Sequence, residues 1–128
     1  MNLQPDLRVN IGGLGLKNPV IAASGTFGYG REYECLLDPG HLGAIVVKGL
    51  SLDPIKGNPP PRIAETPCGM LNAIGLANIG LKEFIKEKLP WLETLDTRVI
   101  VNIYAHRAAD YGELARALNG RDAVSAIE

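Results

Sequence analysis

The alternation of short apolar runs with segments of helical period constrains the fold of this chain more than any other feature. Apolar runs typical of buried strands occur at 19–25, 43–49, 97–104 and 123–128. Segments with apolar residues at about the helical period lie between them, at 31–37, 81–95 and 109–120. Because helical crossovers join parallel strands, this order predicts an α/β fold with a parallel sheet.

Glycine and proline set the boundaries of the non-helical parts. Gly12 and Gly13 can adopt the positive φ angles of a tight turn, which predicts a hairpin over 7–16. The proline-rich segment 53–62 is expected to be an extended surface loop. The glycine-spaced stretch 70–80, MLNAIGLANIG, has neither helical nor strand period and carries no charge.

Individual residues also predict where strands and helices begin and end. The first apolar run is expected to form a buried strand ending at Ala23, and Val99 to Val101 form the third. Pro90 is expected to kink or end the helix over 81–95. Asp110 is a candidate N-cap of the last helix, and Gly120 follows its C-terminus.

Two architectures match this order of elements: a small doubly wound sheet, or the N-terminal half of a (β/α)8 barrel preceded by the hairpin. A complete barrel takes about 250 residues, so 128 residues supply about half of one. The chain also ends on a strand without its helix. We therefore expect residues 1–128 to form a single partial domain.

Composition excludes several classes of protein. A net charge of −1 argues against a nucleic-acid surface. No apolar run reaches the ~18 residues of a membrane span, and the N-terminus lacks the pattern of a secretory signal. Cys35 and Cys68 have no CxxC spacing, so neither a metal site nor a disulfide is expected. A reducing, cytoplasmic location follows.

Polar residues follow three of the apolar runs. They are Ser24, Lys48 and Asn102. Alone, each has an ordinary explanation: Ser24 can satisfy loop amides, Lys48 can extend to solvent, and Asn102 can cap a turn. Because the carboxyl ends of parallel strands meet at one edge, the three together predict a ligand site there.

Lys48 is the most informative of these residues. It can attract an anionic substrate or stabilise negative charge on a bound ring, or it can form a Schiff base. GTFGYG (25–30) lacks the spacing of a dinucleotide-binding loop. His41 precedes its strand and is expected to be structural, and His106 is expected in a solvated loop.

Four motifs, in this order, resemble one known family. They are LKNPVIAASGTFGYGREY, GAIVVKGLS, NPPPRIAETPCGMLNAIGLANIG and VIVNI. Together they resemble the N-terminal half of class 1B dihydroorotate dehydrogenase, the FMN-containing catalytic subunit of a pyrimidine-biosynthesis enzyme. The resemblance runs from about Leu7 to Glu128. It implies a (β/α)8 barrel with FMN at its C-terminal rim, where dihydroorotate passes a hydride to the flavin while a base removes a proton.

The resemblance also implies roles for individual residues. Those implied to contact FMN are Ala23, Ser24, Gly25, Lys48, Gly49 and Asn102. Those implied to bind the substrate are Lys48, Asn72, Ala73, Ile74, Gly75 and Leu76. The implied partner is an electron-transfer subunit that carries FAD and a 2Fe–2S cluster and reduces NAD+. A homodimer of catalytic subunits is also implied.

Three departures from the family pattern matter. Ile79 stands where the family commonly has proline, which should loosen that turn, and YAHR (104–107) replaces a glycine-containing loop. The family's catalytic cysteine, in an N-x-S-C-P-N motif, is expected beyond residue 128, and neither cysteine of this chain matches it. We therefore expect no catalytic residue within the chain, and no turnover and a tendency to aggregate or oligomerise when it is expressed alone.

Two other interpretations stay open. A related FMN barrel, either a fumarate-linked dihydroorotate dehydrogenase or a dihydropyrimidine dehydrogenase-like domain, shares the same rim chemistry. The chain could instead be a non-catalytic remnant that binds a ligand or a partner.

Overall fold

Four parallel strands form the central sheet. The computed structural model describes residues 5–128, so residues 1–4, which open the stretch searched for a secretory signal, lie outside the described residues. The strands, in sheet order, are β3 (Ile21–Ala22), β4 (Ala44–Leu50), β7 (Arg98–Ile103) and β8 (Val124–Ile127). Each strand is added beside the previous one without reversal, whereas a doubly wound sheet reverses its order at a switch point. The α/β prediction is confirmed, in its barrel form.

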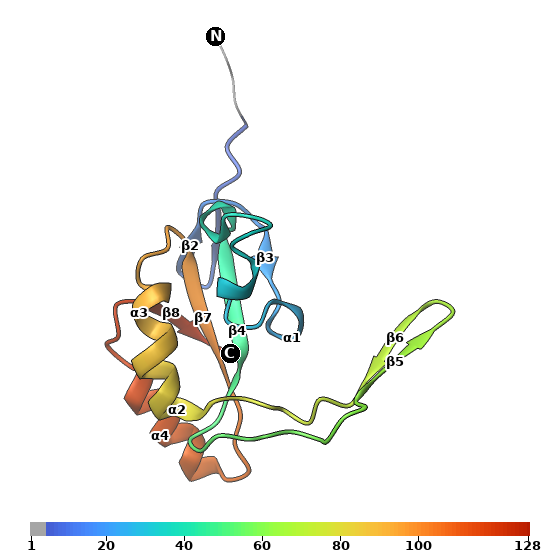
Figure 1. The fold of residues 1–128 in the computed structure, drawn as a ribbon. Helices are drawn as coiled ribbons and strands as arrows, with labels where there is room; N and C mark the ends of the chain where they lie inside the picture. The colour runs from blue at the N-terminus through green and yellow to red at the C-terminus, as the bar shows by residue number, and fades with distance from the viewer. Residues whose placement is uncertain (1–4) are drawn as a thin grey trace.

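Helices cover one face of this sheet (Figure 1). A continuous helix runs through α2 (Gly80–Glu83), a π-helical turn (Phe84–Lys88) and α3 (Leu89–Leu92), and α4 spans Ala108–Leu118. The core between helices and sheet is apolar: Ile45, Val47, Leu50, Phe84, Leu89, Leu92, Val99, Val101, Leu114 and Leu118. Burial of these side chains is the main stabilisation of the fold.

Pro90 does not end its helix. The preceding turn is π-helical, and the N–H of Leu89 donates to the carbonyl of Phe84 five residues earlier. Proline has no N–H and its ring crowds the carbonyl four residues back. A wider turn just before Pro90 accommodates both effects, and the helix continues to Leu92.

Three local predictions were wrong. The segment 31–37 forms only a 3-10 turn, Arg31–Tyr33, whereas a helical turn α1 (Ser24–Phe27) follows β3. Strand β3 is short and open, with Ile21 36% exposed and the preceding Val20 56% exposed, because it is the sheet edge. Asp110 is not an N-cap: Arg107 holds that position, 4.0 Å from the Asp110 carboxylate.

The N-terminal hairpin lies against the other face of the sheet. Strands β1 (Val9–Ile11) and β2 (Leu14–Leu16) pair antiparallel, as expected. A hollow of about 790 Å³ between hairpin and sheet is lined by Val46 and Ile100, among others. This apolar face corresponds to the interior of the barrel.

An unpredicted arm projects from the body (Figure 1). We define the arm as residues 53–79. Its outer part is a hairpin of β5 (Ile63–Thr66) and β6 (Gly69–Asn72), in which Ile63 pairs with Asn72. Residues 69–72 are therefore a strand, although the stretch 70–80 showed no strand period. The proline-rich segment 53–62 is extended, as expected, and meets the returning chain through Ile55 and Asn78.

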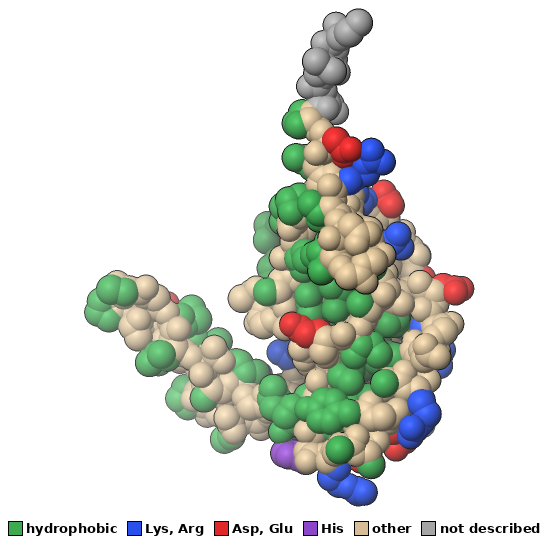
Figure 2. All heavy atoms as spheres, turned by 180° about the vertical axis from the view of Figure 1, so that it is seen from behind, with side chains coloured by type: hydrophobic (Ala, Val, Ile, Leu, Met, Phe, Trp, Pro, Cys, Tyr) green, Lys and Arg blue, Asp and Glu red, His purple; other side chains and the backbone are tan. Residues whose placement is uncertain are grey.

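Every strand residue of this hairpin is exposed. Hydrophobic side chains spread over the arm in Figure 2, and Ile63, Met70 and Leu71 are among them. In the part of the chain from 5 to 128, no helix has the length and apolar character needed to span a bilayer.

Candidate ligand-binding site

A cavity lies between the arm and the carboxyl ends of the strands. Its volume is about 560 Å³, within the range of small-molecule sites. The lining residues are Ser24, Gly25, Lys48, Gly49, Asn72, Ala73, Ile74, Gly75, Leu76 and Asn102. The structure thus brings together every site residue predicted from the sequence except Ala23, which is exposed and is the N-cap residue of α1.

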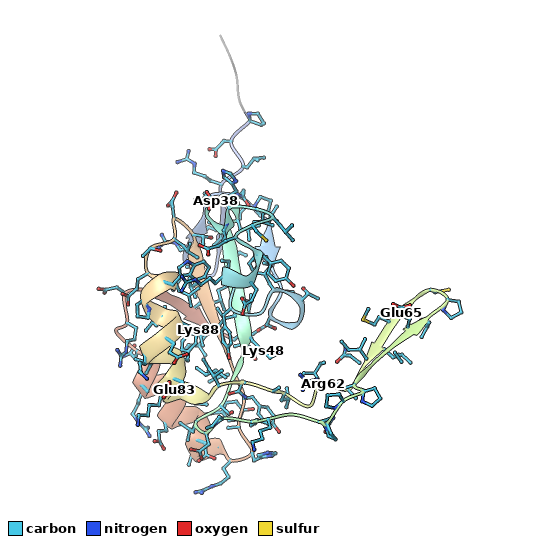
Figure 3. All side chains as sticks on the ribbon, viewed as in Figure 1. Asp38, Lys48, Arg62, Glu65, Glu83 and Lys88 are labelled. Atoms are coloured by element: carbon cyan, nitrogen blue, oxygen red, sulfur yellow. The ribbon has the colours of Figure 1, made fainter. Side chains whose placement is uncertain are left out.

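Lys48 reaches the cavity because β4 is irregular near its end. Pairing with β7 is regular up to Val47 and resumes at Leu50, so the register shifts between them. The Lys48 N–H donates instead to the carbonyl of Gly28 at 2.8 Å. Lys48 lies at the end of β4 from which the arm departs (Figure 3). It is the single charged residue among the described residues that line the cavity.

Gly49 and Asn102 form a close contact between neighbouring strands. A Cβ atom at Gly49 would lie 2.8 Å from Oδ1 of Asn102, so the Asn102 amide would have to move to admit it. The Asn102 amide donates to Oε2 of Glu128 at 2.5 Å, and this bond orients the amide group. A side chain at position 49 would therefore displace the Asn102 amide from this position.

The turn of α1 also lines the cavity, through Ser24 and Gly25. Ser24 is half-buried, and a Cβ atom at Gly25 would meet nothing within 4 Å, so the backbone there faces open space. The Tyr33 hydroxyl donates to the carbonyl of Thr26 at 2.6 Å, and its ring stacks on Phe27. These contacts hold the short turn in place.

The turn at 73–76 forms the arm side of the cavity. Gly75 and Leu76 both have positive φ, +74° and +55°. Asn58 holds the first half of this turn, since its Nδ2 donates to the Ala73 carbonyl at 2.8 Å and its N–H donates to the Ile74 carbonyl at 3.0 Å.

The second half of the turn is held by Asn78, whose Nδ2 donates to the Leu76 carbonyl at 2.9 Å. The amides of Gly75 and Leu76 have no acceptor among residues 5–128. Within the turn, the carbonyls of Ala73, Ile74 and Leu76 thus accept hydrogen bonds, whereas the N–H groups of Gly75 and Leu76 stay available. Free N–H groups and one lysine suit an anionic ligand.

Neighbouring residues support the root of the arm. The Ile79 N–H donates to the Tyr29 hydroxyl at 3.5 Å, a contact that proline at this position could not make. Burial raises the pKa of Tyr29, and the Lys88 ammonium lies 5.6 Å from the centre of its ring.

The other titratable candidates lie away from the cavity lining. Cys35 and Cys68 are exposed and unpaired, and Cys68 lies in the turn between β5 and β6. His41 precedes β4, at the amino end of the sheet, and His106 lies 3.4 Å from the Tyr104 hydroxyl. Residues 5–128 contain no cluster of three or more histidine, cysteine or acidic side chains that could hold a metal.

Sequence reasoning missed the residues that hold the site together. Asn58 and Asn78 lie in segments interpreted only as loop or glycine-spaced stretch. Glycine lies close to both asparagines in the sequence, and a run of prolines follows Asn58. These residues indicate turns with a defined backbone conformation and could have pointed to the two asparagines.

Strands that follow chain order, with a polar cavity at their carboxyl edge, define the N-terminal part of a ligand-binding (β/α)8 barrel. The family model described as dihydroorotate dehydrogenase matches residues 6–128, and the chain belongs to this family.

Similar proteins share one name, "Dihydroorotate dehydrogenase B (NAD(+)), catalytic subunit". The protein from Geotalea daltonii is 58% identical over 125 residues, which are 98% of this chain and 41% of the relative. Those from Thermodesulfovibrio yellowstonii and Thermoanaerobacter pseudethanolicus are 57% and 54% identical, over 97% and 96% of this chain and 41% and 40% of the relatives. The chain thus spans about 41% of the length of the first relatives.

Proposed function

We propose that this chain forms the flavin- and substrate-binding rim of a dihydroorotate dehydrogenase that oxidises dihydroorotate to orotate in pyrimidine synthesis. The observation that supports this most directly is the cavity at the carboxyl ends of β3, β4 and β7. It gathers residues from 24–25, 48–49, 72–76 and 102 into one site. Family membership makes this activity the natural interpretation of such a site.

The site suits FMN as the cofactor. Gly25 leaves open space beside the backbone, and Gly49 allows Asn102 to come close, so a flat ring can approach both strand ends. Ala23, which precedes Ser24 and Gly25 in the chain, is assigned to contact FMN as well. Bound FMN would supply a two-electron acceptor for the hydride of the substrate. In this proposal, the residues of the chain bind and orient the two rings.

The anionic group of dihydroorotate is assigned to Lys48 and the turn. The Lys48 ammonium and the free amides of Gly75 and Leu76 are donors that line the same cavity. Donors aimed at a carboxylate bind it more strongly than donors aimed at a neutral group. The side chain of Asn72 offers both a donor and an acceptor to the ring amides of the substrate.

Proton removal is assigned to a group outside residues 1–128. The described lining of the cavity contains no carboxylate, imidazole or thiol. An ammonium group on Lys48 has no lone pair with which to accept a proton. We therefore propose that this chain binds dihydroorotate without turning it over by itself.

The electron acceptor is proposed to be NAD+, reached through a second subunit that carries FAD and a 2Fe–2S cluster. The relatives are named as NAD(+)-linked catalytic subunits, which supports a separate electron-transfer subunit. A homodimer of catalytic subunits and a cytoplasmic location complete the proposal. Assays of the complete enzyme with NAD+ and with fumarate separate this assignment from a fumarate-linked enzyme.

The proposal is tested by titrating the FMN-loaded protein with orotate and following the flavin absorbance. Lys48→Met should weaken orotate binding by roughly tenfold or more, because a charge-assisted hydrogen bond is lost. Lys56→Met, on the exposed outer side of the arm root, is the matched control and should bind like the wild type. Wild-type protein that takes up FMN and shows no orotate-dependent change would contradict the proposal.

A further inference from the structure

Two buried polar residues lie at the junction between arm and body. Ser51 and Asn78 are each only 8% exposed, and they are the buried polar residues of the part of the chain from 5 to 128. Ser51 directly follows β4, and Asn78 lies at the root of the arm, just before α2. They come from segments 27 residues apart in the sequence.

The Asn78 amide makes full use of its hydrogen-bonding groups. Its Oδ1 accepts from the N–H of Ser51 at 3.3 Å and from the N–H of Gly80 at 2.9 Å. Its Nδ2 donates to the Ser51 hydroxyl and to the Leu76 carbonyl, both at 2.9 Å. The Ser51 hydroxyl in turn donates to the Asp53 carbonyl at 2.7 Å. A fully satisfied buried network of this kind has one defined geometry.

This network connects the two sides of the cavity. One end is attached to the strand that carries Lys48, three residues before Ser51. The other end is attached to the carbonyl of Leu76, the cavity-lining residue with φ of +55° whose N–H has no acceptor among residues 5–128. A shift of Asn78 would therefore change the separation between the Lys48 ammonium and the turn.

We propose that Asn78, supported by Ser51, is a positioning residue. It holds the turn at 73–76 at the separation from Lys48 at which both can bind one anionic group. The inference rests on the proposed function, because the ligand in question is the carboxylate of dihydroorotate or orotate. Asn78 itself acts through Leu76, without touching the ligand.

The first test is the variant Asn78→Asp in the purified FMN-loaded protein. Aspartate has the same shape and keeps the acceptor for the N–H groups of Ser51 and Gly80, but its carboxylate cannot donate to the Leu76 carbonyl or to the Ser51 hydroxyl. Orotate binding should weaken roughly tenfold or more, as for a buried group left without its partner, while FMN binding stays near the wild-type value. Asn119→Asp, an exposed site after α4, makes the same charge change and should leave both affinities unchanged.

The second test separates positioning from a general structural role. In a double-mutant cycle, Asn78→Asp is combined with Lys48→Met, and orotate affinity is measured for all four proteins. If Asn78 sets the separation from Lys48, the loss caused by Asn78→Asp should be clearly smaller once Lys48 is absent. Losses that simply multiply would overturn the inference.

The outcomes also distinguish this inference from the proposed function. If the wild type binds orotate and Asn78→Asp binds it equally well, the positioning role is wrong and the function stands. If the wild type binds FMN but does not bind orotate, the proposed function is wrong, and the positioning role of Asn78 is wrong with it. Should Asn78→Asp not fold, Ser51→Ala decides: orotate binding weakened roughly threefold or more supports the inference, and unchanged binding contradicts it.

Discussion

At the scale of single residues, the site depends on two glycines, which have no side chain to fill the space beside the backbone. A Cβ atom at Gly49 would lie 2.8 Å from Oδ1 of Asn102, so the Asn102 amide keeps its place only beside a glycine. Gly25 leaves open space on the other side of the cavity. The rim of the cavity is therefore shaped by backbone that a ligand can approach, as much as by the polar groups themselves.

Gly49→Ala should displace the Asn102 amide and weaken both ligand binding and the fold. Orotate and FMN affinities of the variant are expected to fall several-fold, with a loss of unfolding free energy of about 1–3 kcal/mol from overpacking. Gly15→Ala is the control, since a Cβ atom there meets nothing within 4 Å. Unchanged ligand affinity of Gly49→Ala would show that the Asn102 position does not matter.

The residues of the cavity could be predicted, whereas those that hold it could not. Ser24, Lys48 and Asn102 follow apolar strands, and a parallel sheet brings such positions to one edge. Asn78 owes its role to Ser51, 27 residues away, and Asn58 to Ala73, 15 residues away. No local pattern encodes these contacts, because they exist only once the arm has folded back on itself.

At the scale of elements, the arm and the sheet differ in how they are stabilised. Strands β4 and β7 are buried beneath helices, whereas all residues of β5 and β6 are exposed. An isolated two-stranded hairpin is only marginally stable in water. Neither face of the β5–β6 hairpin is buried. Its sequence therefore needs no alternation of apolar and polar residues, and hydrophobic patterning did not reveal it.

Hydrogen exchange should show this difference directly. The amides of β5 and β6 are expected to exchange much faster than those of β4 and β7, because local opening costs little there. The amides of Ile55 and Asn78, which bond each other's carbonyls at 3.0 and 2.9 Å, should be better protected than the hairpin. Equal protection of hairpin and central strands would contradict this picture.

An ion pair near the amino ends of the strands predicts a dependence of stability on pH. Lys17 Nζ lies 2.8 Å from the Asp96 carboxylate and holds the pKa of that carboxyl below its usual 3.8. A lowered folded-state pKa contributes stability above the unfolded value, and this contribution is lost as pH falls through the folded value.

Asp96→Asn should accordingly lower the melting temperature slightly at about pH 7, by the small amount typical of an exposed pair. The difference from the wild type should vanish as the pH falls below 3.8, the ordinary value for this carboxyl. Asp122→Asn, at an exposed position with no ion pair among the described residues, is the control. A difference that persists in acid would exclude the ion pair as its cause.

At the scale of the whole molecule, the sheet has one covered face and one face open to the barrel interior. Val46 and Ile100 line the hollow between that second face and the β1–β2 hairpin. The edges, β3 and β8, have no further strand beside them among residues 5–128. The order of the strands was predictable from the alternation of strands and helices. The exposure of β3 was not, because it depends on whether another strand lies beside its free edge.

Residues 1–128 expressed alone are therefore expected to self-associate through these edges and this face. Light scattering should show oligomers or aggregates, and unfolding should be broad. A monodisperse monomer with a sharp cooperative melt would contradict this expectation. Oxidation of dihydroorotate by the same preparation would contradict the assignment of proton removal to a group outside it.

One cavity is proposed to bind both flavin and substrate, and amide hydrogen exchange of the FMN-loaded protein with and without orotate tests this most directly. Orotate should slow exchange at Gly75 and Leu76, whose amides are free in the structure, and near Lys48. The hairpin amides of β5 and β6 should change little. Slowed exchange elsewhere in the chain, with none at 72–76, would show that this cavity is not the substrate site.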